Sequence, residues 1–289
     1  MSRQTSSAKK KSMGAEKFRA FMKNKLAVAG AVLLIVMILL SALSPIIAPY
    51  GYDEQNYAIA RQTPSLSHLA GTDELGRDIF SRILYGGRVS LTIGIISVGI
   101  GLFCGGTLGV LAAYYGGVAE TVIMRVIDIL MAIPSIILSI SICAALGSGI
   151  VNTMIAVGIS SIPTYARVFR SAVISEKSKE YIEASRAVGA GNLRIILRHI
   201  IPNSLAPVIV QASLGVAQAI TTAASLSFIG LGIQPPNPEW GALLSGGRQY
   251  IRDFPHMVIY PGIAIMLTVL ALNLIGDGLR DALDPRLKR

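Results

Sequence analysis

The sequence predicts an all-helical, polytopic membrane protein with six transmembrane helices. Of its 289 residues, 52% are hydrophobic and only 15% are charged, a composition typical of membrane proteins. Long apolar runs recur along the chain, and the stretches between them are polar. The formal charge of +10 comes from lysines and arginines in alternating loops, and only 6% of residues are aromatic. This pattern argues against a nucleic-acid-binding surface.

The first part of the chain predicts a membrane anchor followed by an external loop. Residues 1–25 are basic and are expected to be cytoplasmic, ending in a short surface helix. Residues 26–47 form the first apolar run, which is too long for the core of a cleavable signal peptide and is interpreted as an uncleaved anchor. Residues 48–87 form the external loop.

The second half of that loop predicts an amphipathic helix, GTDELGRDIFSRILYGG, with Thr72 as its N-cap. The spacings Asp73–Arg77 and Asp78–Arg82 would suit ion pairs along that helix. Interfacial anchoring is the favoured interpretation, and a gating or docking role is the alternative.

Residues 88–278 are predicted to form the transmembrane domain. Its five further spans are expected at residues 88–114, 122–146, 150–170, 204–232 and 256–275. In the second span Gly101, Gly105 and Gly109 lie four apart, which lets another helix approach closely. In the third, Pro134 predicts a kink, and Arg125 and Asp128 are spaced to pair with each other. Residues 279–289 are a short charged tail.

The stretch Lys179–Asn203 is too charged to cross a membrane and predicts a helix–turn–helix elbow on its surface. Glycines at 189 and 191 are expected to break the helix. Asn192 would cap the second helix, and Pro202 would stop it. That second helix would place Leu193, Ile196, Leu197, Ile200 and Ile201 on one face.

The fifth span carries polar residues on a single helical face, at Gln211, Gly215, Gln218, Thr222 and Ser225. Inside a membrane such a face points either to a partner helix or to a watery cavity, and periodicity alone leaves both open.

The distribution of charge predicts the orientation. If the N-terminus is inside, the inner loops collect about twenty lysines and arginines and the outer loops about six. The elbow and both termini then lie in the cytoplasm.

The sequence lacks the patterns of nucleotide hydrolysis and metal binding. It contains no GxxxxGK[ST], HExxH or CxxC stretch, and His68, His199 and His256 have no ligand spacing. Cys104 and Cys143 both lie in apolar runs and are interpreted as small buried residues. We therefore expect no catalytic residue, no metal and no bound cofactor in this chain.

Several stretches resemble one family. Glu183-Ala184-Ser185, then Gly189 and the ending Ile201-Pro202, resemble the EAA loop of ABC importer membrane subunits, with Ser185 in place of the second alanine. The stretches HLAGTDELGRDIFSRILYGGRVSL, FIGLGIQPPNPEWG and GDGLRDALDPRLKR are similar to the C-type membrane subunits of dipeptide, oligopeptide and nickel importers. Without these flanks, the elbow would also suit a basic amphipathic loop lying on anionic lipid.

The resemblance implies the six-helix type I importer (MetI-like) fold in the cytoplasmic membrane of a prokaryote. It implies a homologous B-type permease subunit as partner, two ATPase subunits that bind ATP and Mg, and an extracellular or periplasmic solute-binding protein. The EAA loop, residues 176–203, would couple to the ATPases through Tyr181, Glu183, Ala184, Ser185, Gly189 and Leu193. A translocation path would be lined by Gln211, Gln218, Thr222 and Ser225. The proline-rich loop would lie near the external mouth, with Pro235, Pro236 and Trp240.

These features predict a permease subunit that imports peptides by alternating access. Nickel, glutathione or another small solute is the alternative within the family, because selectivity belongs largely to the binding protein. A gradient-driven secondary transporter would need more ionisable residues at mid-membrane than this sequence shows. A scaffold without transport activity is the third possibility.

Overall fold

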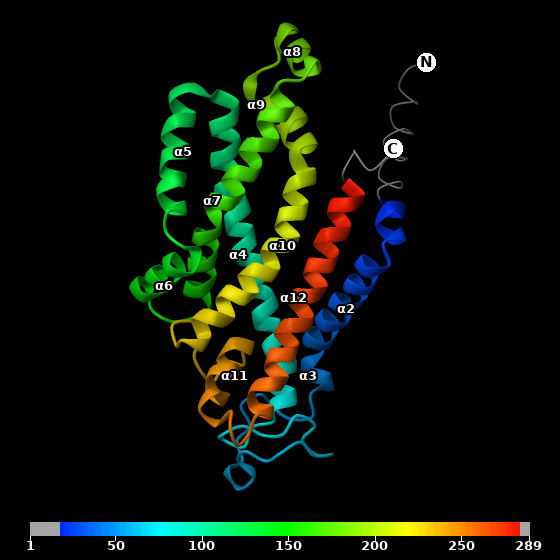
Figure 1. Cartoon of the computed structure of the whole chain (residues 1–289), viewed down its shortest axis with the longest axis vertical. Coiled ribbons are helices and arrows are strands. Elements are labelled where there is room, and N and C mark those ends of the chain that lie inside the picture. Colours follow the sequence, from blue (N-terminus) through cyan, green and yellow to red (C-terminus); the bar gives the residue numbers. More distant parts are fainter. Residues whose placement is uncertain (1–17, 284–289) are drawn as a thin grey trace.

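The computed structural model describes residues 18–283, which are helical apart from loops and one isolated β-bridge between Thr72 and Asp78 (Figure 1). Residues 18–23 are helical and precede the first long helix. The predicted segment 1–17 and the last six residues of the predicted tail lie outside the described residues. The element bounds are α2 (Lys25–Ala42), α3 (Ser44–Ile47), η1 (Tyr57–Ile59), α4 (Ile79–Tyr115), α5 (Gly117–Met131), α6 (Ser135–Leu146), α7 (Ile150–Lys177), α8 (Glu180–Ala187), α9 (Asn192–Ile195), η2 (Ile196–Ile200), α10 (Ile201–Phe228), α11 (Trp240–Gly247), η3 (Arg248–Tyr250) and α12 (His256–Leu283).

The helices give a less regular set of membrane crossings than the six that the sequence predicts. Four described helical segments are long and apolar enough to span a membrane, or five if the bent pair α5–α6 counts as one. Helix α7 has 28 residues, enough to cross, but it is too polar to pass the same test. Two of its arginines, Arg167 and Arg170, pair with acids of α5, as described below. The all-helical membrane fold is confirmed, whereas the count of six is not reproduced by apolarity alone.

Helix α4 combines two predicted elements, the amphipathic helix and the second span, in one continuous helix. It therefore begins before residue 88, where the second span was expected to start. Its 37 residues extend about 56 Å, longer than the hydrocarbon core is thick. The predicted N-cap Thr72 is wrong: Asp78 caps the helix by accepting a hydrogen bond from the Ser81 backbone N–H at 2.7 Å. Asp73 and Arg77 do pair, at 2.6 Å, but in the turn before the helix, and Asp78 pairs with His68 instead of Arg82.

The glycines of α4 let α7 pack directly against its backbone, as predicted. A Cβ at Gly105 would lie 2.4 Å from the Ile162 carbonyl oxygen, and one at Gly109 would lie 2.3 Å from that of Ala166. Contacts this short leave no room for any side chain. The α4–α7 pair therefore forms the rigid centre of the fold.

The predicted third span is broken rather than kinked. Helices α5 and α6 meet at 87° across residues 132–134, where Pro134 is the N-cap residue that precedes α6 (Figure 1). The predicted pair of Arg125 with Asp128 is wrong, because Asp128 accepts from Arg167 of α7 at 2.7 Å. A second pair joins Glu120 to Arg170 Nε at 2.8 Å. Only Ile127 of α5 is buried, so α5 has little apolar packing. The two ion pairs therefore contribute much of the contact that holds α5 against α7.

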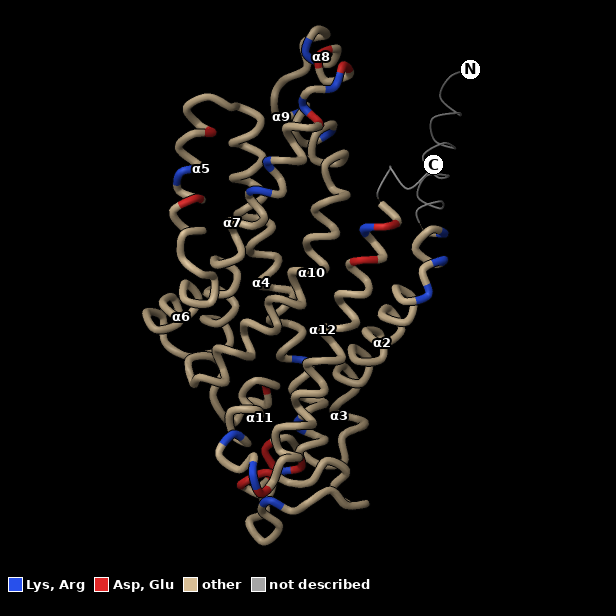
Figure 2. Tube along the Cα trace, in the orientation of Figure 1, with Lys and Arg blue, Asp and Glu red and all other residues tan. Residues whose placement is uncertain are grey.

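Helix α2 lies along α12 at the edge of the bundle (Figure 1). A Cβ at Gly278 would lie 2.2 Å from the Ala27 Cβ, and one at Gly30 would lie 2.7 Å from the Leu274 Cβ. The start of α2, the end of α12 and helix α8 all lie at one end of the molecule, and α11 lies near the other. Figure 2 shows the charged residues gathered toward these two ends, with a largely uncharged middle.

Candidate functional site

The elbow consists of α8, a short loop, α9 and the π-helical turn η2, and it projects beyond the helical bundle (Figure 1). Gly189 ends α8 with a φ of +81°, a conformation that favours glycine. The Gly189 N–H donates to the Arg186 carbonyl at 2.9 Å, and the Ala190 N–H donates to that of Ser185 at 3.1 Å. These are the two bonds of a Schellman motif, so the predicted glycine break is confirmed with a defined geometry.

The second half of the elbow differs from the prediction in two ways. Asn192 is the first residue of α9 rather than its N-cap, and its Oδ1 accepts a hydrogen bond from the Tyr114 hydroxyl at 2.8 Å. Pro202 does not stop the helix, because the chain runs on into α10. The π-helical turn η2 directly precedes Pro202, where a wider turn helps a helix to continue around a residue that lacks an N–H.

An apolar core fixes the elbow to the transmembrane helices. The fully buried side chains of Ile182, Ile195 and Ile200 pack in one cluster with Phe169 and Val173 of α7. Core residues packed in this way hold a single arrangement. A displacement of the elbow would therefore be transmitted to α4 and α7 rather than absorbed locally.

Polar contacts reinforce this attachment around the end of α4. Lys177 at the end of α7 donates to the Tyr114 carbonyl at 2.6 Å and to that of Ala113 at 3.2 Å. A cation is favourable at the carbonyl end of a helix. The Arg186 guanidinium lies 5.7 Å from the centre of the Tyr114 ring. Tyr114, which lies at the end of α4, thus contacts the end of α7 and both halves of the elbow.

The outer surface of the elbow is open. The predicted face of five apolar residues divides: Ile196 and Ile200 are buried, whereas Leu193 is 70% exposed and Leu197 is 57% exposed. Of the predicted coupling residues, five are exposed and Ser185 is half-buried, with its hydroxyl donating to the Tyr181 carbonyl at 2.8 Å; the exposed five are Tyr181, Glu183, Ala184, Gly189 and Leu193. An exposed apolar surface with surrounding charge is typical of a protein-binding surface.

Tyr181 marks the border between the open and the packed sides of the elbow. Its hydroxyl donates to the buried carboxylate of Glu176, which also binds Lys179 Nζ at 2.6 Å. Partial burial, together with the hydrogen bond and charge of Glu176, raises the pKa of Tyr181 to about 12. The phenol therefore stays protonated at neutral pH and keeps donating to Glu176.

A cavity of about 310 Å³ lies where α7, α10, α12 and the start of α6 meet. Three of the four predicted path residues line it, namely Gln211, Gln218 and Thr222, and so does Gly215. Ser225 does not line this cavity: it is exposed, and its hydroxyl donates to the Thr221 carbonyl at 2.8 Å. The sequence analysis missed Tyr165, Ser160 and Asn273, because helical phase within one span says nothing of what other helices bring to the same place.

The proline-rich loop lies at the end opposite the elbow, near α11 (Figure 1). Pro235 and Pro236 are exposed. Trp240, the third residue expected near the external mouth, is 0% exposed, and its indole N–H donates to the Ile83 carbonyl at 2.9 Å. The backbone of the loop approaches α4 over Gly86, where a Cβ would lie 2.1 Å from the Pro238 carbonyl oxygen. Trp240 is therefore a structural anchor of the loop.

Glu239, which the sequence analysis did not single out, caps α11 beside that tryptophan. Its carboxylate is 1% exposed and accepts from the Ala242 N–H at 2.9 Å and from the Ser90 hydroxyl at 3.2 Å. An acid placed just before an apolar helical stretch is the sequence signal that could have found it.

The loop before α4 contains a buried cluster of charges. The Asp73 carboxylate accepts from Arg77 Nε at 2.6 Å and lies 3.6 Å from Arg82 Nε. Arg82 also donates to the Tyr52 carbonyl at 2.7 Å, which ties the loop to α4. Within residues 18–283 no cluster of three or more histidine, cysteine or acidic side chains has the geometry to hold a metal ion.

Comparison with known proteins gives consistent matches. The family model described as binding-protein-dependent transport system inner membrane component matches residues 105–289, and that of the N-terminal TM domain of oligopeptide transport permease C matches residues 12–64. The dipeptide transport system permease protein DppC of Alkalihalophilus pseudofirmus is 49% identical over 273 residues, covering 94% of this chain and 90% of the relative. The glutathione transport system permease protein GsiD of Pectobacterium atrosepticum is 47% identical over 274 residues, covering 94% and 91%.

Solved structures share the fold. An inward-facing structure of the MetNI methionine ABC transporter superposes with a TM-score of 0.59 at 20% identity, covering 71% of this chain and 98% of that chain. An amino acid ABC transporter crystallised with histidines superposes with a TM-score of 0.53 at 14% identity, covering 70% and 94%.

Proposed function

Since this chain belongs to the family of binding-protein-dependent transport system inner membrane components, we propose that it is the permease subunit of an ATP-driven peptide importer. Peptide is favoured over other cargo by the 49% identity with a dipeptide permease over 94% of the chain. Glutathione is the second candidate, supported by the 47% identity with a glutathione permease. The cargo reaches the permease from a separate solute-binding protein on the external side.

The elbow is the proposed site of coupling to the ATPases, and its geometry is the observation that carries this proposal. An exposed patch around Leu193 and Glu183 sits on a core that is packed directly against α4 and α7. A protein that bound this patch could move the transmembrane helices without first having to order the elbow. ATP and Mg would be bound by two such partner subunits.

In this proposal a homologous B-type permease subunit completes the translocation path. On this chain the path is lined by Gln211, Gln218 and Thr222 of the cavity, and it continues past Ser225, which is exposed outside the cavity. Both termini and the elbow lie in the cytoplasm, and Pro235 and Pro236 lie at the external mouth. The elbow moves when ATP closes the ATPase subunits, and the cavity between α7 and α10 alternates between the two sides of the membrane.

Uptake in the native host tests this function. We would delete the gene, restore it on a plasmid, and measure uptake of radiolabelled alanyl-alanine and of glutathione separately. We expect ATP-dependent uptake of alanyl-alanine to be lost on deletion and restored by the plasmid. Restoration of glutathione uptake alone would favour the second candidate. Uptake that persists without ATP but with an ion gradient would favour a secondary transporter and contradict the proposal.

A further inference from the structure

The hydroxyl of Tyr165 is a buried polar group that the packing leaves without a partner. Tyr165 lies in the middle of α7 and is 1% exposed, and its oxygen makes no hydrogen bond to any of the described residues. A buried hydroxyl without a partner destabilises the folded state relative to a paired one. Such a group needs an explanation, and a ligand that pairs with it supplies one.

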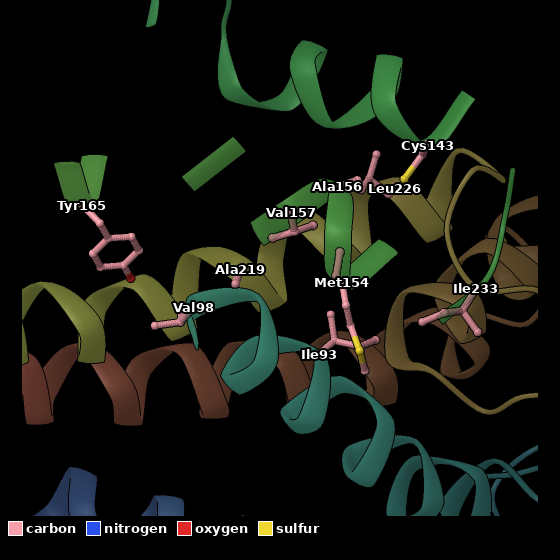
Figure 3. Close-up of a cluster of buried hydrophobic side chains, with 11 residues drawn as sticks. Ile93, Val98, Cys143, Met154, Ala156, Val157, Tyr165, Ala219, Leu226 and Ile233 are labelled. Atoms are coloured by element: carbon pink, nitrogen blue, oxygen red, sulfur yellow. The ribbon is translucent and has the colours of Figure 1, made fainter. Parts of the chain in front are cut away.

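The Tyr165 hydroxyl lies against α10, beside the cavity. Figure 3 shows the Tyr165 side chain reaching from α7 to the ribbon of α10. It comes to rest over Gly215, where a Cβ would lie 2.0 Å from the phenol oxygen. Gly215 lines the same cavity of about 310 Å³ as Tyr165 itself. The glycine on α10 therefore makes the space that the tyrosine hydroxyl occupies.

The lining of the cavity is polar but carries no charge. Its polar side chains are hydroxyls and amides, from Ser135, Ser160, Ser161, Thr164, Tyr165, Gln211, Gln218, Thr222 and Asn273, and no acidic or basic side chain lines it. Several hydroxyls are already used: those of Ser160 and Ser161 donate to backbone carbonyls of α7 at 2.9 and 2.7 Å. The Tyr165 hydroxyl and the Gln211 side-chain amide make no hydrogen bond to any residue within 18–283.

This chemistry selects for a neutral hydrogen-bonding group. The uncharged lining offers no counter-charge to a carboxylate or ammonium, so the charged termini of a peptide would lie toward the open side of the cavity and only its amide would lie against these residues. A peptide bond instead offers one N–H donor and one carbonyl acceptor. The phenol and the glutamine amide can each donate and accept, so they match both halves of that group.

We propose that the cavity is a subsite for the main-chain amide of a transported peptide, and that the Tyr165 hydroxyl hydrogen-bonds to that amide. The inference rests on the proposed function, because it names what the importer recognises within the membrane. Recognition of the amide rather than of side chains or termini allows peptides of different sequence to pass the same point.

Ligand-dependent thermal stabilisation of the assembled importer tests the subsite directly. The probes are glycylglycine and 5-aminopentanoate, which has the same terminal charges and chain length but no amide. We expect glycylglycine to raise the unfolding temperature with increasing concentration and 5-aminopentanoate to have no such effect. In Tyr165→Phe we expect roughly fivefold more glycylglycine to be needed for the same shift, the ratio that corresponds to one neutral hydrogen bond.

The matched control is Tyr115→Phe, which removes the same atom from an exposed tyrosine at the end of α4. It should leave the glycylglycine dependence unchanged. Tyr165→Phe should fold normally, since the lost hydroxyl pairs with no described residue. An unchanged glycylglycine dependence in Tyr165→Phe, or equal stabilisation by both probes, would overturn the inference. The uptake experiment tests the proposed function separately. If deletion abolishes alanyl-alanine uptake but Tyr165→Phe leaves the glycylglycine dependence unchanged, the proposed function stands and only the subsite is wrong.

Discussion

The two ends of the molecule use their charged residues in opposite ways. At the end opposite the elbow, Asp73, Arg77 and Arg82 are buried together, and Asp78 is buried against His68. At the elbow, Arg194 and Arg198 are exposed and make no ion pair within the described part of the chain. The buried charges stabilise the loop before α4, whereas those of the elbow are accessible to another protein.

This difference separates structural from functional charge, which composition cannot do. A buried charge that loses its partner is strongly destabilising, whereas an exposed charge contributes little to stability. Substitutions of the buried charges at the end opposite the elbow should therefore unfold the loop before α4. Substitutions at the elbow should leave folding intact and change transport.

The largest expected effect is that of Asp73→Ala. It removes the carboxylate that pairs with Arg77 at 2.6 Å and lies 3.6 Å from Arg82. Glu74 remains 3.3 Å from Arg77 but makes no ion pair with the buried Arg82, so we expect a loss of about 3 kcal/mol in stability. Thermal unfolding of the full-length chain in detergent measures it. The matched change at the elbow, Glu183→Ala, should alter stability by less than about 0.5 kcal/mol. Equal losses in both variants would abolish the distinction between the two ends.

A second variant, Gly189→Asp, should uncouple transport from ATP hydrolysis. Any side chain at this φ of +81° is strained by about 1–2 kcal/mol, although the space around it is open. The Schellman turn should therefore rearrange and displace the exposed patch. We would measure ATP hydrolysis and alanyl-alanine uptake by the assembled importer, and expect uptake to fall several-fold relative to hydrolysis.

The control for this variant lies two residues away. Gly191→Asp adds the same charge to the same open loop, but at a φ of −67° that any residue adopts. We expect it to transport normally. If both variants fail equally, the added charge rather than the backbone is responsible, and the role assigned to the turn is wrong.

The smallest expected effect is that of Tyr114→Phe. It removes the hydrogen bond to Asn192 while keeping the ring beneath Arg186, so we expect a loss of about 1 kcal/mol. Hydrogen exchange of the elbow amides should increase, with the rest of the bundle unaffected. Tyr115→Phe is the comparison, and an equal increase there would show that Tyr114 does not hold the elbow.

The sequence predicted local features well where one segment determines them. The glycine break at Gly189 follows from backbone conformation, and the close packing at Gly105 follows from the missing side chain. It failed where the outcome depends on a distant segment. Asp128 pairs with Arg167, which is 39 residues away and competes with its neighbour Arg125.

The same limit applies at the candidate sites. Trp240 was expected near the external mouth, but its complete burial depends on Gly86 and Ile83 of α4, which the sequence of the loop does not show. Pro202 looked like a helix stop, but the π-helical turn before it was not visible in any periodicity. The cavity combines both cases. Helical phase identified the residues of α10 that line it, but it could not identify Tyr165, because Tyr165 comes from another helix, α7.

The side of the membrane on which Leu193 lies tests the central claim most directly. Leu193→Cys would be made in a chain in which Cys104 and Cys143 are replaced by alanine, and treated with a membrane-impermeant thiol reagent. We predict labelling in inverted vesicles but not in intact cells, and protection from labelling when the ATPase subunits are bound. Labelling from the outside of intact cells would place the elbow where no ATPase could reach it and would contradict the account.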